Sequence, residues 1–470
     1  MQIYIAIKFY VGYYSGSICD FLQTAWQEKL KMYDGSVSKS VLKNILPAMA
    51  ASLLTLVYNI ADTFFIGRTH NDLMLAAVSL ATPAFLIFMS LGTLFGVGGA
   101  SVVARSLGAG NKKRACRASA FCIWCCAAVG VICMAVFWIF MERILILMGA
   151  SSDSMEYTRE YLNIVTGCGV FSMLVQCLSN LIRAEGRPGV AMAGSLFGNI
   201  LNIILDPVFI LVFGWGTRGA AIATVIGTTA GALFYIIYIV SGKYTLSARL
   251  RDFSWKDGIG KEVFGIGIPA ALTTFLMSIS QIIANSLISA YGDMAVAAYG
   301  VASKVRMCFG IIGAGLGQGL QPLLAYYYGA GNRQRFKKSF RFSLVFGFVL
   351  FFVFTVIFFI FAEPIVKVFL TDSTALGYGV IFSRMLLTVT WVISIHNIFV
   401  SVLHATGAKA ASFFAAIAGQ GVIYIPLLFI LRAFFGLNGL VCAQPVSEGI
   451  SLVIVIILAE FTVRKFYRTD

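Results

Sequence analysis

Two carboxylates stand inside otherwise apolar stretches of this chain. Asp62 follows Tyr58 by four residues, and Asp206 follows Asn202 by four residues. Residues four apart lie on one face of a helix, so each carboxylate is expected to point the same way as its polar companion. Ionisable groups within apolar helices are costly to bury and usually serve a function. These residues are therefore the first candidates for chemistry.

The depths of these side chains can be compared by counting residues along each apolar segment. Asp62 is 16 residues beyond Leu46, and Asp206 is 16 residues beyond Val190. Both then lie ~24 Å from the expected cytoplasmic surface. Thr224 belongs to the next segment, which runs the other way, and is expected ~10 Å below the outer surface. In a span of ~30–35 Å all three side chains share one level in the outer half.

An oxygen-rich cluster of this kind has two chemical uses. Na⁺ is a hard cation and prefers oxygen ligands, which Asp62, Asn202, Asp206 and Thr224 would supply. Alternatively, two close carboxylates in a low dielectric cannot both stay charged, so one of them would hold a proton. The sequence leaves Na⁺ and H⁺ both open. A structural role, such as a helix cap beside Pro207, is the competing interpretation.

The composition shows which elements must position these groups. Of the 470 residues, 59% are apolar and 12% are charged, whereas soluble chains have about 45–50% and about 25%. Segments of ~20–30 apolar residues suit membrane-spanning helices and are too long for the strands of a membrane barrel. We therefore predict an all-α polytopic membrane protein. Twelve transmembrane helices are expected near residues 45–67, 73–104, 116–141, 157–183, 189–213, 217–240, 264–290, 294–325, 339–362, 376–404, 409–432 and 436–460.

The twelve segments form two copies of six. The tetrapeptide at 108–111 (GAGN) recurs at 329–332, and Pro47 recurs as Pro269. An even number of spans per copy gives both copies the same orientation, so the repeats are parallel. We expect a disordered N-terminal extension at 1–40, an N-lobe at 41–240, a cytoplasmic linker at 241–262, a C-lobe at 263–461 and a cytoplasmic tail at 462–470. Residues 1–31 are interpreted as disordered or as a misassigned start.

Basic residues orient the chain. The connections at 105–117 and 333–341 each hold five Lys or Arg and no acidic residue. Such loops stay in the cytoplasm, which places both termini there and the protein in the cell (inner) membrane. The formal net charge of +15 is explained in the same way, so no nucleic-acid partner is predicted.

The C-lobe lacks the carboxylate pair, since Ala284 stands at the position equivalent to Asp62. We expect Lys304 and Glu448 to pair across two helices, and we interpret the remaining charges as structural or as snorkelling side chains. The buried ionisable residues predicted for this lobe are Lys304, Arg306, Arg384, His396 and Glu448.

No cofactor is predicted. Cys122, Cys125 and Cys126 lie in an apolar run without a nearby histidine, so they are interpreted as buried apolar residues. The chain has no GxxxxGK[ST] loop, so no ATP site is expected. The 40 Phe and 15 Met suit a cavity for aromatic cations, which are attracted by stacking and cation–π contacts.

Several motifs carry a family resemblance. They are YNIADTFFIG at 58–67, NIILDP at 202–207, QGLQP at 318–322 and FGLNG at 435–439. Together they resemble motifs of the multidrug and toxin extrusion (MATE) transporters, in particular the bacterial DinF-like branch, over about residues 40–460.

The resemblance implies two six-helix lobes arranged in a V around a central cavity. It also implies export of cationic, amphipathic drugs in exchange for Na⁺ or H⁺. In that family the first-helix aspartate is the coupling carboxylate, which corresponds to Asp62. Residues that correspond to other polar positions of the family's site are Tyr58, Asn180, Asn202, Asp206 and Thr224.

The sequence thus predicts a monomeric alternating-access antiporter that is not an enzyme and that contacts membrane lipids and small amphipathic molecules. Two alternatives stay open. A flippase for lipid-linked saccharide precursors would use a basic cavity, for which Lys304, Arg306 and Arg384 are available. An intramembrane enzyme would use the aspartate pair as an acid–base dyad, but the chain offers no companion nucleophile motif.

Overall fold

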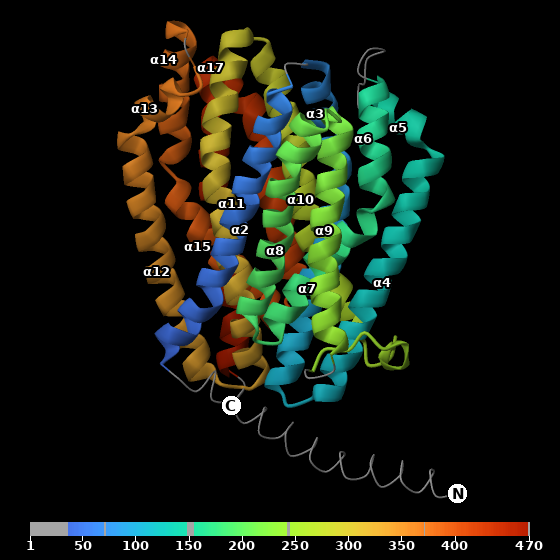
Figure 1. The fold of residues 1–470 in the computed structure, drawn as a ribbon. Helices are drawn as coiled ribbons and strands as arrows, with labels where there is room; N and C mark the ends of the chain where they lie inside the picture. The colour runs from blue at the N-terminus through green and yellow to red at the C-terminus, as the bar shows by residue number, and fades with distance from the viewer. Residues whose placement is uncertain (1–35, 70–71, 148–154, 242–244, 371, 469–470) are drawn as a thin grey trace, which may run out of the picture.

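The computed structural model describes residues 36–69, 72–147, 155–241, 245–370 and 372–468. Within these ranges all regular structure is helical, and the helices run roughly parallel to one axis (Figure 1). The prediction of an all-α membrane protein is confirmed. Most of the expected N-terminal extension, residues 1–35, lies outside the described residues, as do residues 469–470 of the expected tail.

The described residues of the first half of the chain form eight helices and one π-helical turn. These elements are α2 (Val37–Gly67), α3 (Asp72–Gly108), α4 (Lys112–Ile139), α5 (Met141–Leu147), α6 (Met155–Gly167), α7 (Gly169–Ala184), α8 (Pro188–Pro207), η1 (Val208–Val212) and α9 (Gly216–Val240). The fourth predicted span is broken, because α6 and α7 meet at an angle of 49°. The fifth span continues from α8 into η1 directly after Pro207, whose ring removes one backbone donor.

The second half of the chain repeats this order after a short 3₁₀ turn, η2 (Leu250–Asp252). Its elements are α10 (Ile259–Ser289), α11 (Asp293–Gly329), α12 (Arg333–Ile360), α13 (Ala362–Lys367), α14 (Ser373–Leu387), α15 (Thr390–Thr406), α16 (Lys409–Ile417), η3 (Ala418–Val422) and α17 (Tyr424–Arg468).

By length and apolar composition, 10 helical runs in the described chain could cross a membrane, or 11 with the bent α6–α7 pair. The last run, Lys409–Arg464, has 56 residues, which is far more than the ~20 that a bilayer needs. It is non-helical at Gly436 (φ 59°, ψ −132°). Ser447 Oγ donates to the carbonyl of Gly419 over 2.7 Å, so the chain after Gly436 packs back on the chain before it. The run is therefore two antiparallel spans, which gives the predicted twelve.

The repeated GAGN tetrapeptide stops one helix and starts the next. Gly110 and Gly331 have φ angles of 75° and 66°, a left-handed conformation that favours glycine. The following residues, Asn111 and Asn332, are N-caps of α4 and α12. Each accepts a 3.0 Å hydrogen bond from the backbone N–H three residues later. The same four residues thus build the same tight reversal twice.

The two halves of the chain meet at glycines that let backbones touch. A Cβ atom on Gly98 of α3 would lie 2.2 Å from the Val263 carbonyl of α10, and one on Gly319 of α11 would lie 2.6 Å from the Asn44 carbonyl of α2. Gly98 and Gly319 occupy equivalent positions in the two repeats, so the two contacts form a pair. Both lie in the half of each helix near the basic loops, which is the lower end in Figure 1. The lobes therefore join at that end.

Ion pairs at the basic end strengthen this junction. Arg105 and Arg114 both bind the Glu262 carboxylate, at 3.0 and 2.6 Å, and Arg117 binds Asp257 at 2.8 Å. All three arginines come from α3 and α4, whereas both acids come from the linker and the start of α10. The linker thus fastens the first lobe to the second.

The glycine junction predicts a difference between two alanine substitutions. Gly98→Ala inserts a methyl group against backbone, whereas Gly310→Ala in α11 meets no atom within 4 Å. We expect Gly98→Ala to cost about 1–3 kcal/mol by overpacking, and Gly310→Ala to be neutral or stabilising by up to ~1 kcal/mol. Thermal unfolding of the purified protein in detergent measures both, and equal melting temperatures would contradict the junction.

Candidate functional site

Side chains from four elements converge in the first lobe, at the ends of the helices opposite the basic loops. α2 contributes Tyr58 and Asp62, α8 contributes Asp206 and α9 contributes Thr224. The fourth element, α6, contributes Tyr161, which the sequence analysis missed. Its phenol lies within interaction distance of Thr224 and of both carboxylates, as does the phenol of Tyr58.

Asn202 connects α8 to α9 and orients one carboxylate. With its amide turned to satisfy both partners, its nitrogen donates to Asp206 Oδ2 over 3.0 Å, and its oxygen accepts from the Thr224 backbone N–H, also over 3.0 Å. Asp206 is fully buried and Asp62 is 8% exposed. Neither Asp62 Oδ1 nor Asp206 Oδ1 has a hydrogen-bond partner among the described residues. Each buried carboxylate thus keeps one oxygen available.

The packing of α8 on α9 explains why these groups meet. A Cβ atom on Gly198 would lie 2.7 Å from the Gly227 carbonyl, and one on Gly227 would lie 2.6 Å from the Gly198 carbonyl. The two helices therefore touch backbone to backbone one turn from Asn202. On the other side of α8, the amide of Asn199 donates to Thr55 Oγ1 of α2 over 3.2 Å. These contacts hold α2, α8 and α9 together beneath the carboxylates.

The helix registers put the cluster at one level. Asp62 precedes the end of α2 by five residues, Asp206 precedes the end of η1 by six, Tyr161 follows the start of α6 by six, and Thr224 follows the start of α9 by eight. At ~1.5 Å per residue these distances are ~8–12 Å. The same count, applied to α6, is the sequence signal that would have found Tyr161.

The structure does not bring Asn180 into this cluster. Asn180 lies four residues before the end of α7, at the end of that helix near the basic loops. Its Nδ2 donates to the Gln176 carbonyl, and its Oδ1 accepts from Arg183 over 3.2 Å. Arg183 also donates to Gln318 of α11 over 2.9 Å. Asn180 is therefore part of the junction between the lobes.

The expected pair between Lys304 and Glu448 is wrong, because Glu448 pairs with Arg306. The two basic residues are two positions apart on α11, so their side chains leave the helix on nearly opposite sides. Arg306 points toward α17, where Gln444 Nε2 also donates to the Glu448 carboxylate over 3.1 Å. Lys304 is exposed, and no described side chain forms an ion pair with it.

The other two ionisable residues predicted for this lobe, His396 and Arg384, have ordinary neighbours. His396 lies on α15 with Nε2 3.2 Å from Ser451 Oγ. The Arg384 guanidinium lies over the ring of Phe359, 5.6 Å from its centroid. Neither belongs to the network of Arg306 and Glu448.

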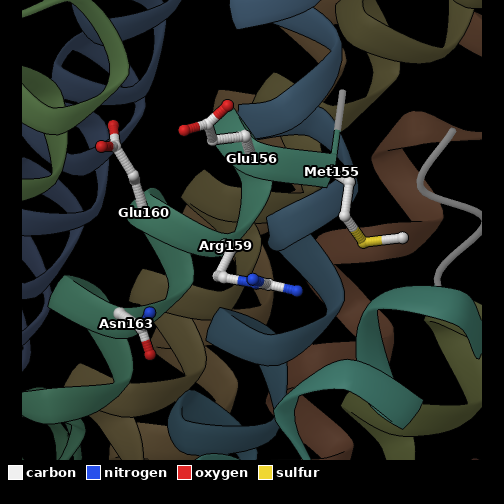
Figure 2. A pocket seen from close by; sticks show the side chains of 5 residues that line it. All are labelled: Met155, Glu156, Arg159, Glu160 and Asn163. Atoms are coloured by element: carbon white, nitrogen blue, oxygen red, sulfur yellow. The ribbon is translucent and has the colours of Figure 1, made fainter. Parts of the chain in front are cut away.

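A hollow of about 370 Å³ lies at the start of α6 (Figure 2). Four of its five lining residues are polar or charged, and none is a predicted site residue, although the hollow lies on the helix that carries Tyr161. Arg159 of this hollow forms a 3.3 Å ion pair with Glu142 of α5. The lining residues are Met155, Glu156, Arg159, Glu160 and Asn163.

The cluster suits a small hard cation or a proton better than a transition metal. The ligand atoms in the cluster are all oxygens, from two carboxylates, two phenols, an amide and a hydroxyl, and the cluster offers no thiolate or imidazole. In the described part of the chain, no group of three or more His, Cys, Asp or Glu residues could hold a metal ion. A bound cation or proton would neutralise charge that the apolar bundle otherwise leaves uncompensated.

Comparison with known proteins gives consistent results. The MatE family model matches residues 47–208 and 269–430, so it matches once in each repeat. "Multidrug export protein MepA" of Staphylococcus haemolyticus (strain JCSC1435) is 32% identical over 417 residues, which cover 89% of this chain and 92% of that protein. MepA of Staphylococcus aureus (strain MRSA252) is 33% identical over 424 residues, which cover 90% and 94%.

Solved structures share the fold. A multidrug resistance MATE family transporter of the MOP superfamily in an outward-facing conformation superposes with a TM-score of 0.88 at 22% identity, and the match covers 93% of this chain and 98% of that one. A MATE structure in a bent conformation, also 22% identical and with the same coverage, gives 0.86.

The ion pair in the second lobe predicts non-additive effects on stability. The side chains of Arg306 and Glu448 are 21% and 13% exposed, so removing either one leaves a buried charge. We expect Arg306→Met or Glu448→Gln alone to cost about 3–5 kcal/mol and the double variant to cost clearly less than their sum. Thermal unfolding of the three variants measures this, and additive losses would mean that the two side chains do not interact.

Proposed function

The chain belongs to the MatE family, and from this premise we propose that it is a secondary active multidrug exporter. It would exchange cationic or amphipathic compounds for H⁺ or Na⁺ by alternating access. The proposal is supported by relatives that bear the name multidrug export protein and match 89–90% of the chain. The chain is a multi-pass membrane protein, and we place it as a monomer in the cell membrane with cytoplasmic termini.

The observation that carries the coupling role is the pair of buried carboxylates with one free oxygen each. Asp62 and Asp206 come from different helices, so an ion bound between them would tie α2 to α8. When the ion leaves, its attraction to the two carboxylates is lost, and the carboxylates repel each other. Ion binding therefore favours one arrangement of the first lobe over another, which is what coupling requires.

The same helix, α2, reaches the junction between the lobes. Its Asn44 and Ala48 pack against Gly319 of α11, and its Asp62 interacts with Asp206 of α8. A shift of α2 at the ion site can therefore alter the contact on which the lobes hinge. With basic loops in the cytoplasm, the junction closes the cytoplasmic side and the site faces the outer half.

The flippase alternative receives less support. It calls for several free basic side chains along the path, but Arg306 is paired with Glu448 and Arg384 lies over Phe359. Of the basic residues considered for such a path, Lys304 and Arg384 are both exposed and neither forms an ion pair in the described chain, but Arg384 stacks on Phe359 whereas Lys304 has no such contact there. A drug exporter with one basic side chain in its path fits these contacts better.

Conservative substitutions test the coupling role. We expect Asp62→Asn and Asp206→Asn each to reduce ion-driven export at least ~10-fold, because loss of one charge-assisted interaction weakens ion binding by about 1.5–3 kcal/mol. Proteoliposomes with separately imposed Na⁺ and pH gradients measure export of ethidium and identify the ion. Asp372→Asn is the matched control, since Asp372 caps α14 outside the spans. Full export by both site variants would overturn the proposal.

A further inference from the structure

Lys304 is a charged side chain far inside a membrane-spanning helix. It lies 11 residues from the start of α11 at Asp293, or ~16 Å along the helix. It is exposed, and no ion pair links it to any residue that the structure describes. An unpaired ammonium facing lipid at this depth is strongly unfavourable, so such a group normally faces a water-filled space or a partner.

The helix phase shows which space Lys304 faces. Gly315 and Gly319 mark the side of α11 that packs on α2, since Cβ atoms there would lie 2.9 Å from Met49 Cα and 2.6 Å from the Asn44 carbonyl. Lys304 precedes Gly315 by 11 residues, which is about three helical turns. Lys304 therefore points toward the first lobe, and its side chain is exposed there.

The opposite side of α11 is occupied by its own lobe. Ser401 Oγ of α15 donates to the Gly317 carbonyl over 3.0 Å. Arg306 also lies on that side, with its partner on α17. Gly300, one turn from Lys304, has no atom within 4 Å of its Cβ position. Lys304 and Gly300 thus share an open stretch of α11 on the side that faces the first lobe.

Two amides of α10 share this wall. Gly267 and Ala271 mark the side of α10 that faces the first lobe, through contacts with Leu94 and with Ser90. Gln281 and Asn285 follow Gly267 by 14 and 18 residues, which are about four and five turns, so they lie on the same side. Gln281 Nε2 donates to Asn285 Oδ1 over 3.3 Å, which leaves the Asn285 amide as a further donor.

The two lobes hold groups of opposite charge. The first lobe holds Asp62 and Asp206, whereas Pro83 stands at its position equivalent to Lys304. The second lobe presents the Lys304 ammonium and amide donors. The two carboxylates are buried within the first lobe, whereas Lys304 is exposed. A molecule lying between the lobes can therefore contact the basic site directly, while the acidic site acts on it through its charge. Ammonium and amide donors bind carboxylates best among common drug groups.

We propose that Lys304, with Gln281 and Asn285, recognises the carboxylate of zwitterionic amphipathic substrates. The inference rests on the proposed export function and adds a specificity residue to it. Lys304 would select for a carboxylate and repel a purely cationic compound at the same place. Its removal should therefore affect the two substrate types differently.

A pair of dyes that differ in one charge tests this. Rhodamine B carries a carboxylate, and its ethyl ester carries none. We expect Lys304→Gln to raise the KM for rhodamine B export about tenfold and to leave that for the ester unchanged or lower. Lys304→Arg should retain discrimination. Lys367→Gln is the matched control, because Lys367 pairs with Glu363 on the exposed helix α13.

Binding to the purified protein, followed by fluorescence anisotropy, separates this inference from the export function. If Lys304→Gln weakens binding of rhodamine B but not of its ester, while the wild-type protein exports neither dye, the subsite stands and the export proposal falls. Equal effects on both dyes, or none on either, would overturn the subsite. Lys304-dependent competition by phosphatidylglycerol in nanodiscs, without discrimination between the dyes, would assign the lysine to a lipid phosphate and overturn it as well.

Discussion

The cost of charge in an apolar bundle is the constraint on which the rest depends. Asp62 and Asp206 are almost completely buried, and each leaves one oxygen without a donor among the described residues. A carboxylate in such a place is unstable unless a cation, a proton or a donor compensates it. Asn202 compensates Asp206 in part. The uncompensated oxygens are the place where the proposed coupling ion would bind.

Duplication supplied one scaffold, and the two lobes use it for different chemistry. The glycine contacts at Gly98 and Gly319 are equivalent, and so are the reversals after Gly110 and Gly331. The polar interiors differ, since the first lobe keeps an unpaired acid cluster and the second neutralises Glu448 with Arg306. An internal ion pair needs no external ion, so in the proposed function ion exchange belongs to the first lobe.

The sequence predicted what depends on length, period and spacing. The spans followed from apolar length, and the shared level of Asp62, Asp206 and Thr224 followed from counting residues along helices. The same count could not show that Arg306 rather than Lys304 reaches Glu448, because this depends on helix phase and on where α17 packs. Tyr161 was missed because α6 is amphipathic and breaks from α7 at Cys168, which hides a site residue in a short helix.

The placement of α2 explains how a local charge can affect the whole assembly. Its first half packs against the second lobe at Gly319, and its last turns carry Tyr58 and Asp62. Pro47 lies between the ends of this helix and removes one of its backbone hydrogen bonds, so α2 bends most easily there. α2 is therefore held at one end by the junction between the lobes, and it bends most easily at Pro47, close to that end. The same helix thus links the charge state of Asp62 to the packing between the lobes.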